Sequence, residues 1–455
     1  GYRLRIPATP GGVPLHEVSG ARPAALVSGL SPNTQYWAQV LALDPAGAQL
    51  GAPSAELAVT TPYPLAAPLV QVTAKSSVSL SVSWLKPPSG TKLQLEWTAP
   101  GKKAKTTKPS GTKLVKTGLK AKTGYTVRAR LLRGHTVVSA WTDPIVTTTP
   151  DGDPLRVASY NVLCANCKAW GPRRQGIANT IIDANVDVVG VQEASAAPLK
   201  GSRLSQFEDL ARLLAPAGYR MTNLTRFNCR NANNYKHCRE TYRGASGSVR
   251  IIYNTKTVKL ISTGSRQLAD LPSYGTDRFV AWAILEHKIN GKRFLFTSTH
   301  LEPRNDTAGS RHYYVIRNAQ ARKVVQTIAA HRGKLPVIAV GDYNSTKWDV
   351  PTNGPYDIMR AAGFIDPLGN SYHSTTSTSG ATVEKRINTQ YSSYNAFEPN
   401  ARRTDGVNGS NCDYIFTSKM RVTEWETVLK VNAQGRFEGT PPSDHNLVRA
   451  TVLLP

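Results

Sequence analysis

The sequence has no long apolar run and few acidic residues, and each shortage excludes a class of protein. No apolar stretch in the 455 residues approaches the ~20 residues of a transmembrane helix, so we expect no membrane-spanning helix. A content of 40% hydrophobic and 19% charged residues is ordinary for a globular protein and excludes a wholly disordered chain. The chain starts at Gly1 without an initiator methionine or a secretory signal, so we expect a processed or trimmed start.

Cysteine is also scarce, and the five cysteines all lie beyond residue 163. Cys164 and Cys167 have a spacing found in redox sites and zinc half-sites, but no second pair at ligand spacing completes a zinc site. Cys229 and Cys238 flank a polar stretch, and we expect a disulfide to close this loop. Such a disulfide indicates an oxidising compartment and therefore a secreted protein. Because five is odd, one cysteine stays free or pairs in a way that the sequence does not assign.

The shortage of acidic residues leaves a formal net charge of +26, from 56 Lys and Arg against 30 Asp and Glu. This balance indicates a polyanionic partner, such as nucleic acid, an anionic lipid surface or an acidic cell-surface polymer. Residues 1–62 are neutral, whereas residues 63–150 hold 14 basic and two acidic residues, a net charge of +12. Residues 151–455 carry the remaining +14 over more than three times that length, so the charge is densest in the middle segment.

An internal repeat divides the first 150 residues. Residues 29–43 and 118–132 share Gly-Leu, a threonine and then a tyrosine that opens an alternating strand, and each copy leads to a Thr-rich exit and a proline. These residues resemble the fibronectin type III family, with Tyr36 and Tyr125 at the tyrosine position of that family and Trp84 at its core tryptophan. The resemblance implies two all-β sandwiches at residues 1–62 and 63–150. The first lacks residues for its opening strands, so we expect it to be truncated.

Such modules are usually spacers, but the second one carries a run of eight lysines between residues 102 and 122 without one acidic residue. A run of charge is often only a solvated face of the protein. The alternative is that these lysines bind a polyanion, such as an anionic cell-surface polymer.

The pattern changes after the linker at residues 151–154. Short apolar strands are predicted at 155–162, 186–191, 248–253, 279–285, 293–299, 336–340, 413–417 and 447–453, and amphipathic helices at 173–185, 204–214 and 317–330. Residues 374–411 are rich in Ser, Thr, Asn and Gly and predict one long loop. Strands mixed with helices over 300 residues predict a layered α/β domain with two sheets at residues 151–455.

Polar groups stand where five of these apolar segments end: Ser-Tyr-Asn161, Gly-Val-Gln-Glu193, Ser-Thr-His300, Gly-Asp342-Tyr-Asn344 and Ser-Asp444-His445. Asn161 and Glu193 end consecutive strands of one β-α-β unit, so we expect them side by side at one sheet edge. Carboxylate and amide oxygens are the ligands that Mg²⁺ prefers. Each block alone is too short to be specific, since strand-end carboxylates are often helix caps or surface charges.

Taken in order, and with Asn-Cys-Asp413-Tyr-Ile-Phe, the blocks resemble the endonuclease/exonuclease/phosphatase superfamily, whose fold is that of deoxyribonuclease I. The resemblance covers residues 155–455 and implies a four-layer α/β domain with two packed sheets. It implies that Glu193, Asn161 and Asp444 hold Mg²⁺, with Mn²⁺ and Ca²⁺ as alternatives, and that Asp342 and Asn344 position or deprotonate the attacking water. It further implies that His445, oriented by Asp413, contacts the phosphate or acts as general base, and that His300 stabilises phosphoryl oxygens or protonates the leaving oxygen.

Members of this superfamily cleave nucleic acids, dephosphorylate inositol lipids or split sphingomyelin. Arginines suited to phosphate contact occur at Arg250, Arg304, Arg386, Arg402 and Arg403, although surface arginines of a basic protein are often simply solvated. We expect Tyr391 and Tyr394 to stack on bases. A lipid hydrolase would be expected to show an exposed apolar wedge that enters the membrane, and the sequence offers only scattered candidates for it, such as Trp348.

The leading hypothesis is a secreted, monomeric, metal-dependent phosphodiesterase that cleaves extracellular DNA or RNA. The Thr-, Ala- and Pro-rich linkers are typical of bacterial chains. A sphingomyelinase-like or inositol-phosphate phosphatase-like hydrolase is the alternative within the same chemistry. A surface adhesin, whose basic module binds polyanions, is the alternative from another class.

Overall fold

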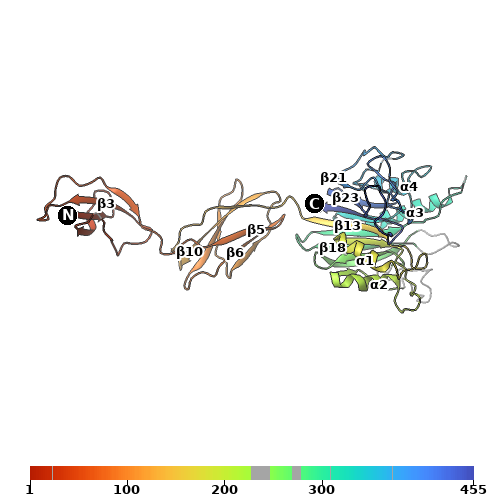
Figure 1. Ribbon diagram of the computed structural model, residues 1–455, viewed down its shortest axis with the longest axis horizontal. Helices are drawn as coiled ribbons and strands as arrows, with labels where there is room; N and C mark the ends of the chain where they lie inside the picture. Colours follow the sequence, from red (N-terminus) through yellow and green to blue (C-terminus); the bar gives the residue numbers. More distant parts are fainter. Residues whose placement is uncertain (23, 227–245, 269–277, 308, 371) are drawn as a thin grey trace. The chain divides into compact units, whose positions relative to one another are not determined.

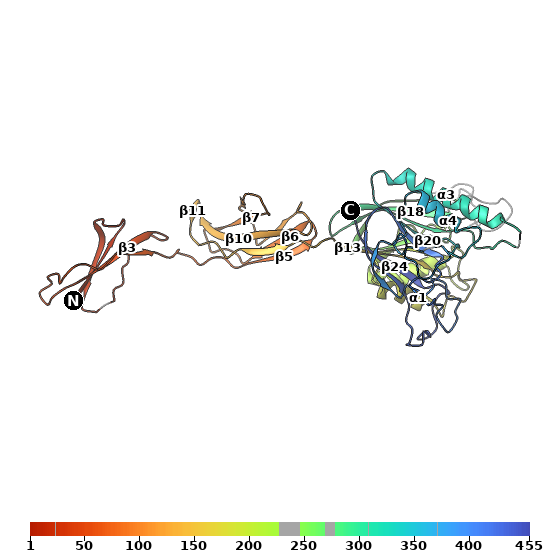
Figure 2. The same cartoon turned by 90° about the horizontal axis from the view of Figure 1, so that it is seen from above.

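A computed structural model describes residues 1–455 apart from 23, 227–245, 269–277, 308 and 371. The chain divides into two compact units, Gly1–Asp151 and Gly152–Pro455 (Figures 1 and 2). In the described part of the chain, no helix is both long and apolar enough to cross a membrane. The predicted disulfide between Cys229 and Cys238 lies outside the described residues.

The first unit is all-β, as predicted. One sheet has the order β2-β1-β3-β4, from β1 (Tyr2–Pro7), β2 (Pro14–Gly20), β3 (Gln35–Ala42) and β4 (Leu57–Thr60). Few of its side chains are buried, among them Ile6, Tyr36 and Leu41, and large apolar ones such as Leu15 and Leu57 stay exposed. This thin core fits a module with too few strands, and its truncation stays a prediction.

Residues 63–150 form two sheets that share one core. The first sheet has the order β5-β6-β9, from β5 (Val70–Ser76), β6 (Ser79–Trp84) and β9 (Lys113–Lys116). The second has the order β11-β10-β7-β8, with β12 paired to β10, from β7 (Lys92–Thr98), β8 (Lys105–Thr107), β10 (Gly124–Arg133), β11 (Thr136–Val137) and β12 (Ile145–Thr148). Alternate residues point inward, because the side-chain period of a strand is two, and Trp84, Leu95 and Val127 pack in the shared core.

The repeated tyrosine has the same contact in both copies. The hydroxyl of Tyr36 accepts a hydrogen bond from the backbone N–H of Ser31 at 3.0 Å, and that of Tyr125 accepts one from Lys120 at 2.8 Å. Each tyrosine therefore fastens the turn five residues before it. The fibronectin type III identity of the two modules stays a prediction.

The second unit packs two sheets face to face between two pairs of helices (Figures 1 and 2). The larger sheet has the order β15-β16-β14-β13-β24-β23-β21, from β13 (Pro154–Asn161), β14 (Val188–Gln192), β15 (Tyr219–Met221), β16 (Arg250–Asn254), β21 (Val383–Ile387), β23 (Arg421–Val428) and β24 (Leu447–Leu453). The smaller has the order β17-β18-β19-β20-β22, from β17 (Val258–Gln267), β18 (Phe279–His287), β19 (Arg293–His300), β20 (Val337–Asp342) and β22 (Asp413–Thr417).

Three apolar clusters hold these layers together. Side chains from both sheets, such as Val157 and Phe296, form the central cluster. Helices α1 (Arg174–Asp183) and α2 (Gln206–Leu214) cover the outer face of the larger sheet, while α3 (His312–Arg332) and α4 (Gly354–Ala361) cover that of the smaller sheet. The predicted layered α/β domain with two sheets is therefore confirmed.

One element departs from the sequence prediction. The sequence predicts a single loop over residues 374–411, but β21 lies inside this segment. It pairs in parallel with β23 and forms the edge of the larger sheet. The strand Val-Glu-Lys-Arg-Ile has no apolar alternation strong enough to stand out, because it lies at a sheet edge where charged side chains remain in solvent.

The two sheets approach closely near the carboxyl end of β14. A side chain at Gly190 would place its Cβ 2.5 Å from Val340 Cγ2 and 2.6 Å from Ser298 Oγ, so only glycine fits between the sheets here. Two residues further along β14, Gln192 Nε2 donates to Ser298 Oγ at 3.1 Å. The strand ends that follow are thereby held next to one another across the two sheets.

Candidate active site

Strand pairing places the predicted catalytic residues of the smaller sheet on one line. In the register of β19, β20 and β22, His300 is opposite Asp342, and Asp342 is opposite Asp413. We call these three residues the Asp342 rung. In the larger sheet, Asn161 ends β13, and Glu193 directly follows β14. Because β13 and β14 are parallel, as are β19 and β20, the carboxyl ends of each pair lie side by side, and a hydrogen bond from Asn161 to Asp342 joins the two pairs across the sheets.

The carboxylate of Asp342 is the centre of the cluster. Its Oδ2 atom accepts a hydrogen bond from Asn161 Nδ2 at 3.0 Å and lies 3.5 Å from His300 Nε2 and 3.8 Å from His445 Nε2. Burial, with the Asp413 carboxylate nearby, raises the pKa of Asp342 to about 7. A buried carboxyl group with a pKa near neutrality is suited to exchanging protons with a reactant.

Asp413 and His445 form a buried ion pair. His445 Nδ1 lies 2.8 Å from Asp413 Oδ2, and both side chains are almost completely buried. Burial opposes the charge on the imidazole, but the Asp413 carboxylate outweighs this and raises the pKa of His445 well above its usual value. The pair therefore directs the Nε2 atom of a cationic imidazole toward Asp342.

His300 is in the opposite protonation state. The guanidinium of Arg278 lies 3.0 Å from His300 Nδ1, and since arginine only donates, Nδ1 must accept. Burial, with Arg278 and His445 nearby, lowers the pKa of His300 well below its usual value. A neutral imidazole that accepts at Nδ1 carries its proton on Nε2, the nitrogen that lies 3.5 Å from Asp342 Oδ2.

Arg278 was missed by sequence reasoning. The residue immediately precedes β18, and the register of β18 with β19 pairs Val280 with Thr299, next to His300. The signal was available only through that strand register, because 22 residues separate the arginine from the histidine.

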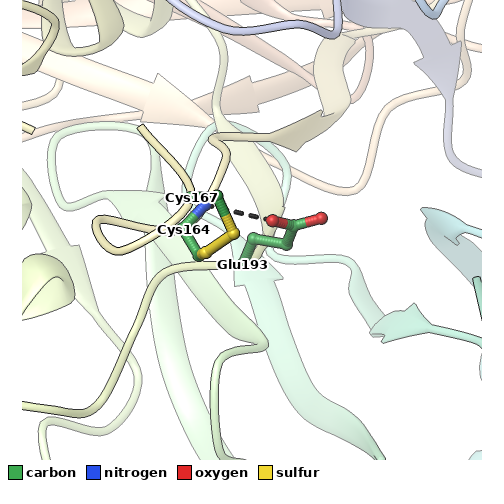
Figure 3. A group of neighbouring side chains, drawn as sticks. All are labelled: Cys164, Cys167 and Glu193. Carbon is green, nitrogen blue, oxygen red and sulfur yellow. Dashed lines mark hydrogen bonds between the residues drawn. A yellow bond between two sulfur atoms is a disulfide. The ribbon is translucent and has the colours of Figure 1, made fainter. Parts of the chain in front are cut away.

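Glu193 is fixed by two donors. Asn161 Nδ2 donates to Glu193 Oε1, and the backbone N–H of Cys164 donates to Oε2, each at 3.0 Å. The backbone of Glu193 has a φ of 59°, in the left-handed region, which turns the chain sharply after β14. The fixed carboxylate lies beside the Cys164–Cys167 loop, as Figure 3 shows.

Cys164 and Cys167 form a disulfide, so neither sulfur is available as a thiolate ligand for zinc. Cys412 is a free cysteine in the described part of the chain, and it is buried beside Asp413 and His445. Burial raises the pKa of its thiol to about 12, which keeps it protonated.

The donor atoms present fit a hard divalent cation. Glu193, Asp342, Asp413 and Asp444 bring four carboxyl groups to this edge, and burial raises the pKa of Asp444, partly offset by His445. Asn161 Oδ1 accepts from the backbone N–H of Leu163 at 3.0 Å and keeps a second lone pair. Oxygen ligands of this kind bind Mg²⁺, Mn²⁺ or Ca²⁺ rather than a soft metal.

Two neighbouring residues shape this edge. Ser443 Oγ donates to the backbone oxygen of Asn161 at 2.7 Å, which ties the segment carrying Asp444 and His445 to the end of β13. The backbone N–H of Asn344 donates to Asp342 Oδ1 at 2.9 Å, while its Nδ2 donates to the Leu301 carbonyl at 3.1 Å. Asn344 therefore orients the Asp342 carboxylate through its backbone.

The predicted substrate-binding arginines lie in different surroundings. Arg250 is 1% exposed, with its guanidinium 3.9 Å from the Phe207 ring and hydrogen-bonded to the Gly247 and Thr225 carbonyls. The prediction that Arg250 contacts substrate is wrong, because its charge is enclosed in the interior. Arg304 pairs with Glu302, while Arg386 and Arg403 line an open polar cavity of about 490 Å³.

Of the predicted arginines, Arg402 is linked to the cluster around Asp342 through Tyr394. It pairs with Glu398, and its guanidinium lies 5.2 Å from the ring of Tyr394. Tyr394 is 37% exposed and meets the His445 ring edge-on, with centroids 5.0 Å apart. Tyr391, also expected to stack on bases, is buried and cannot do so.

Comparison with known proteins agrees with this geometry. Residues 158–445 match the family described as the Endonuclease/Exonuclease/phosphatase family. A comparison with curated proteins gave no match.

Several solved structures are similar to about two thirds of this chain. A member of the same family from Bacteroides thetaiotaomicron is 23% identical, with a TM-score of 0.48 over 67% of this chain and 99% of that one. A mannosyl-6-phosphatase from the same organism is also 23% identical, with a TM-score of 0.47 over 66% of this chain and 99% of that one. The catalytic domain of human Nocturnin is 19% identical, with a TM-score of 0.44 over 66% of this chain and 94% of that one. The family match spans more than half of the chain and includes the whole cluster around Asp342, and the chain therefore belongs to the endonuclease/exonuclease/phosphatase family of phosphoric ester hydrolases.

Proposed function

We propose that the protein is a secreted, monomeric, metal-dependent phosphodiesterase that cleaves nucleic acid. The observation that carries this proposal is the Asp413–His445 pair directed at Asp342, beside the fixed carboxylate of Glu193. Secretion is supported by the Cys164–Cys167 disulfide, because disulfides persist in oxidising compartments.

Glu193 and Asp444, with Asn161 beside them, would hold the metal ion. When bound, Mg²⁺ supplies positive charge that neutralises the developing negative charge on the phosphoryl group. Such a cation would also offset the surplus of carboxylates at this edge of the domain.

The side chains of the cluster would supply proton transfer and stabilisation of the phosphoryl oxygens. Asp342, centred between the two imidazoles, accepts a proton from the attacking water, whose oxygen forms the new bond to phosphorus as the ester P–O bond breaks. The cationic His445 and the neutral His300 each carry an N–H on the Nε2 atom beside Asp342, where a phosphoryl oxygen bound next to Asp342 would accept it and be stabilised. The leaving oxygen takes its proton from solvent.

A nucleic acid substrate is supported by the aromatic groups beside His445. Tyr394 is partly exposed against the imidazole and carries the Arg402 guanidinium on its ring. Phe397 follows three residues later in the chain, and Lys168 Nζ lies 3.3 Å from the centre of its ring. Rings flanked by cations suit a base next to a scissile phosphate.

A lipid phosphodiester is the second candidate, and a separate observation favours it. Trp348 and Val350 follow the catalytic strand β20 in the chain and are 45% and 76% exposed. Exposed apolar side chains of this kind can enter a lipid surface.

One substrate panel tests both candidates. The full chain with Mg²⁺, Mn²⁺ or EDTA is offered single-stranded DNA, RNA, sphingomyelin vesicles and a sugar phosphate. We expect metal-dependent cleavage of a polynucleotide. Turnover of vesicles or of the sugar phosphate, with polynucleotides left intact under every metal condition, would overturn the nuclease proposal. A Trp348→Ser, Val350→Ser variant then sharpens the result, because it should weaken cleavage of vesicles and leave cleavage of oligonucleotides unchanged.

A further inference from the structure

The second module contains a cleft that the catalytic site does not explain. It lies between β8 and β9, which are edge strands of the two different sheets, and has a volume of about 590 Å³. Its polar residues include the lysines Lys102, Lys103, Lys105 and Lys116, and its apolar residues include Trp97, Leu114, Leu119 and Tyr125. We call this feature the lysine cleft.

The lysine cleft offers hydrogen-bond donors to a ligand and no carboxylate. None of its four lysines has a carboxylate within 4.0 Å in the described part of the chain. Of the two acidic residues in this module, Glu96 is already paired with Arg128 at 2.6 Å. Four unpaired ammonium groups around one cavity would repel one another, so an anion bound between them would be stabilised.

The apolar side of the lysine cleft narrows the class of anion. Leu114 and Leu119 are only partly buried against the core of the module, so a ligand in the cavity can cover them. Trp97 also lines the cavity, and its indole Nε1 is buried without a hydrogen-bond partner. A ligand that fits both sides carries negative charge at regular intervals and flat apolar groups between the charges.

We propose that the lysine cleft binds single-stranded nucleic acid, with phosphates on the lysines and a base or sugar against the apolar side chains. A duplex hides its bases in pairs, and an inorganic polyphosphate has none, so each would use only half of the site. The function of the cleft as a site that recruits substrate rests on the proposed nuclease function, whereas the binding itself does not.

The test measures binding of a fluorescent single-stranded oligonucleotide to the full chain in EDTA, which suppresses turnover. We expect the Lys102→Gln, Lys103→Gln, Lys105→Gln variant to bind at least tenfold more weakly. The slope of log Kd against log salt concentration should fall by about 2, since each phosphate contact on a single strand contributes about 0.7. The matched control changes three exposed lysines of the same module that lie outside the cleft, Lys75, Lys86 and Lys92, to glutamine. An equal loss in this control would overturn the proposal, because general charge would then explain the binding.

A second comparison tests the apolar side. An oligonucleotide with abasic sites has the same backbone charge and should bind the unmodified protein about tenfold more weakly, and a polyphosphate or a duplex should also bind more weakly. The preference for bases should shrink in the cleft variant. Equal binding of the abasic strand, or a preference that survives in the cleft variant, would overturn the proposal. Because no step depends on hydrolysis, a failed nuclease proposal would leave this result interpretable.

Discussion

The cluster around Asp342 and the lysine cleft are opposite in charge and differ in burial. Around Asp342, acidic side chains are buried at the ends of paired strands and held by hydrogen bonds of about 3 Å. In the lysine cleft, four flexible basic side chains surround a cavity between two sheet edges. The net charge of +26 describes neither region. The acids are suited to hold a cation at a fixed point, while the lysines attract an anion without fixing it.

The largest expected effect is the loss of hydrolysis when the metal ion is removed. Chelation with EDTA should lower hydrolysis by about 10⁴-fold, because a cation at the phosphoryl group contributes several kcal/mol of stabilisation to the transition state. Oligonucleotide binding by the lysine cleft should be unchanged. Turnover and binding measured on the same sample check both halves of the comparison. Full turnover in EDTA would contradict a metal-dependent site.

The next effect concerns the buried ion pair. Asp413→Asn removes the charge that keeps His445 cationic and oriented, and His445→Ala removes the imidazole. Each should lower kcat by about 10²- to 10⁴-fold with little change in KM, since the group acts on the transition state. His331→Ala is the matched control, because His331 stacks on Trp282 at the end of α3, away from the cluster. An active His445→Ala variant would show that the assignment of the site is wrong.

A smaller effect is expected for the residue that positions His300. In Arg278→Ala, Nδ1 of His300 loses its donor, so the imidazole can take the other tautomer and turn its unprotonated nitrogen toward the substrate. We expect kcat to fall by on the order of 10- to 100-fold, as for other residues that orient a functional group.

The pH profile separates this role from a purely structural one. The loss of the neighbouring cation should raise the pKa of His300, so the pH dependence of kcat should shift in Arg278→Ala. Arg293→Ala, at the opposite end of β19, should leave both kcat and its pH profile unchanged. An unchanged pH profile in Arg278→Ala would contradict the positioning role.

The smallest effect is expected at Lys347, which is buried, unlike the exposed lysines of the cleft. Lys347 is 1% exposed, and its Nζ donates to the Asn408 carbonyl at 2.9 Å. Burial lowers its pKa to about 8, so between pH 8 and 10.5 the unfolded chain binds more protons and stability rises with pH. Lys347→Met lacks this dependence. Lowering the pKa from 10.5 to about 8 costs the folded protein roughly 3 kcal/mol at pH 7, since one pKa unit corresponds to about 1.36 kcal/mol. The lost hydrogen bond offsets about 1 kcal/mol of this, so we expect the variant to be about 2 kcal/mol more stable at pH 7.

That advantage should shrink as the pH approaches 10, and denaturant unfolding at several pH values measures it. The exposed Lys334→Met variant should show no such trend. A difference that stays constant from pH 7 to pH 10 would contradict the lowered pKa of Lys347.

The sequence could predict the residues of the cluster because they follow apolar strands directly. Strand direction predicted Asn161 and Glu193 at one sheet edge, whereas His300 and Asp342, which also end strands, were assigned to the site only through the family resemblance. The sequence could not place Arg278 or exclude Arg250, because both depend on where a long side chain lies in three dimensions. Arg250 belongs to a strand that is buried throughout, which a run of Arg-Ile-Ile-Tyr-Asn does not reveal.

The sequence could predict the charge of the lysine cleft but not its cavity. The run of lysines was evident, but it could not show that β8 and β9 belong to different sheets with a cavity between them. Side chains that alternate along a strand reveal one face of one sheet, whereas a cavity depends on how two sheets part at their edges.

The alignment of the Asp342 rung is set by backbone pairing between strands. His300, Asp342 and Asp413 are aligned by the hydrogen bonds between β19, β20 and β22, so a shift of one residue in β20 would misplace Asp342 against both neighbours. The groups suited to contact substrate, such as Tyr394, Trp348 and Arg402, lie outside these strands in connecting segments. Loops can therefore be exchanged or redesigned for another phosphoric ester while the register, and with it the hydrolytic machinery, is carried over intact.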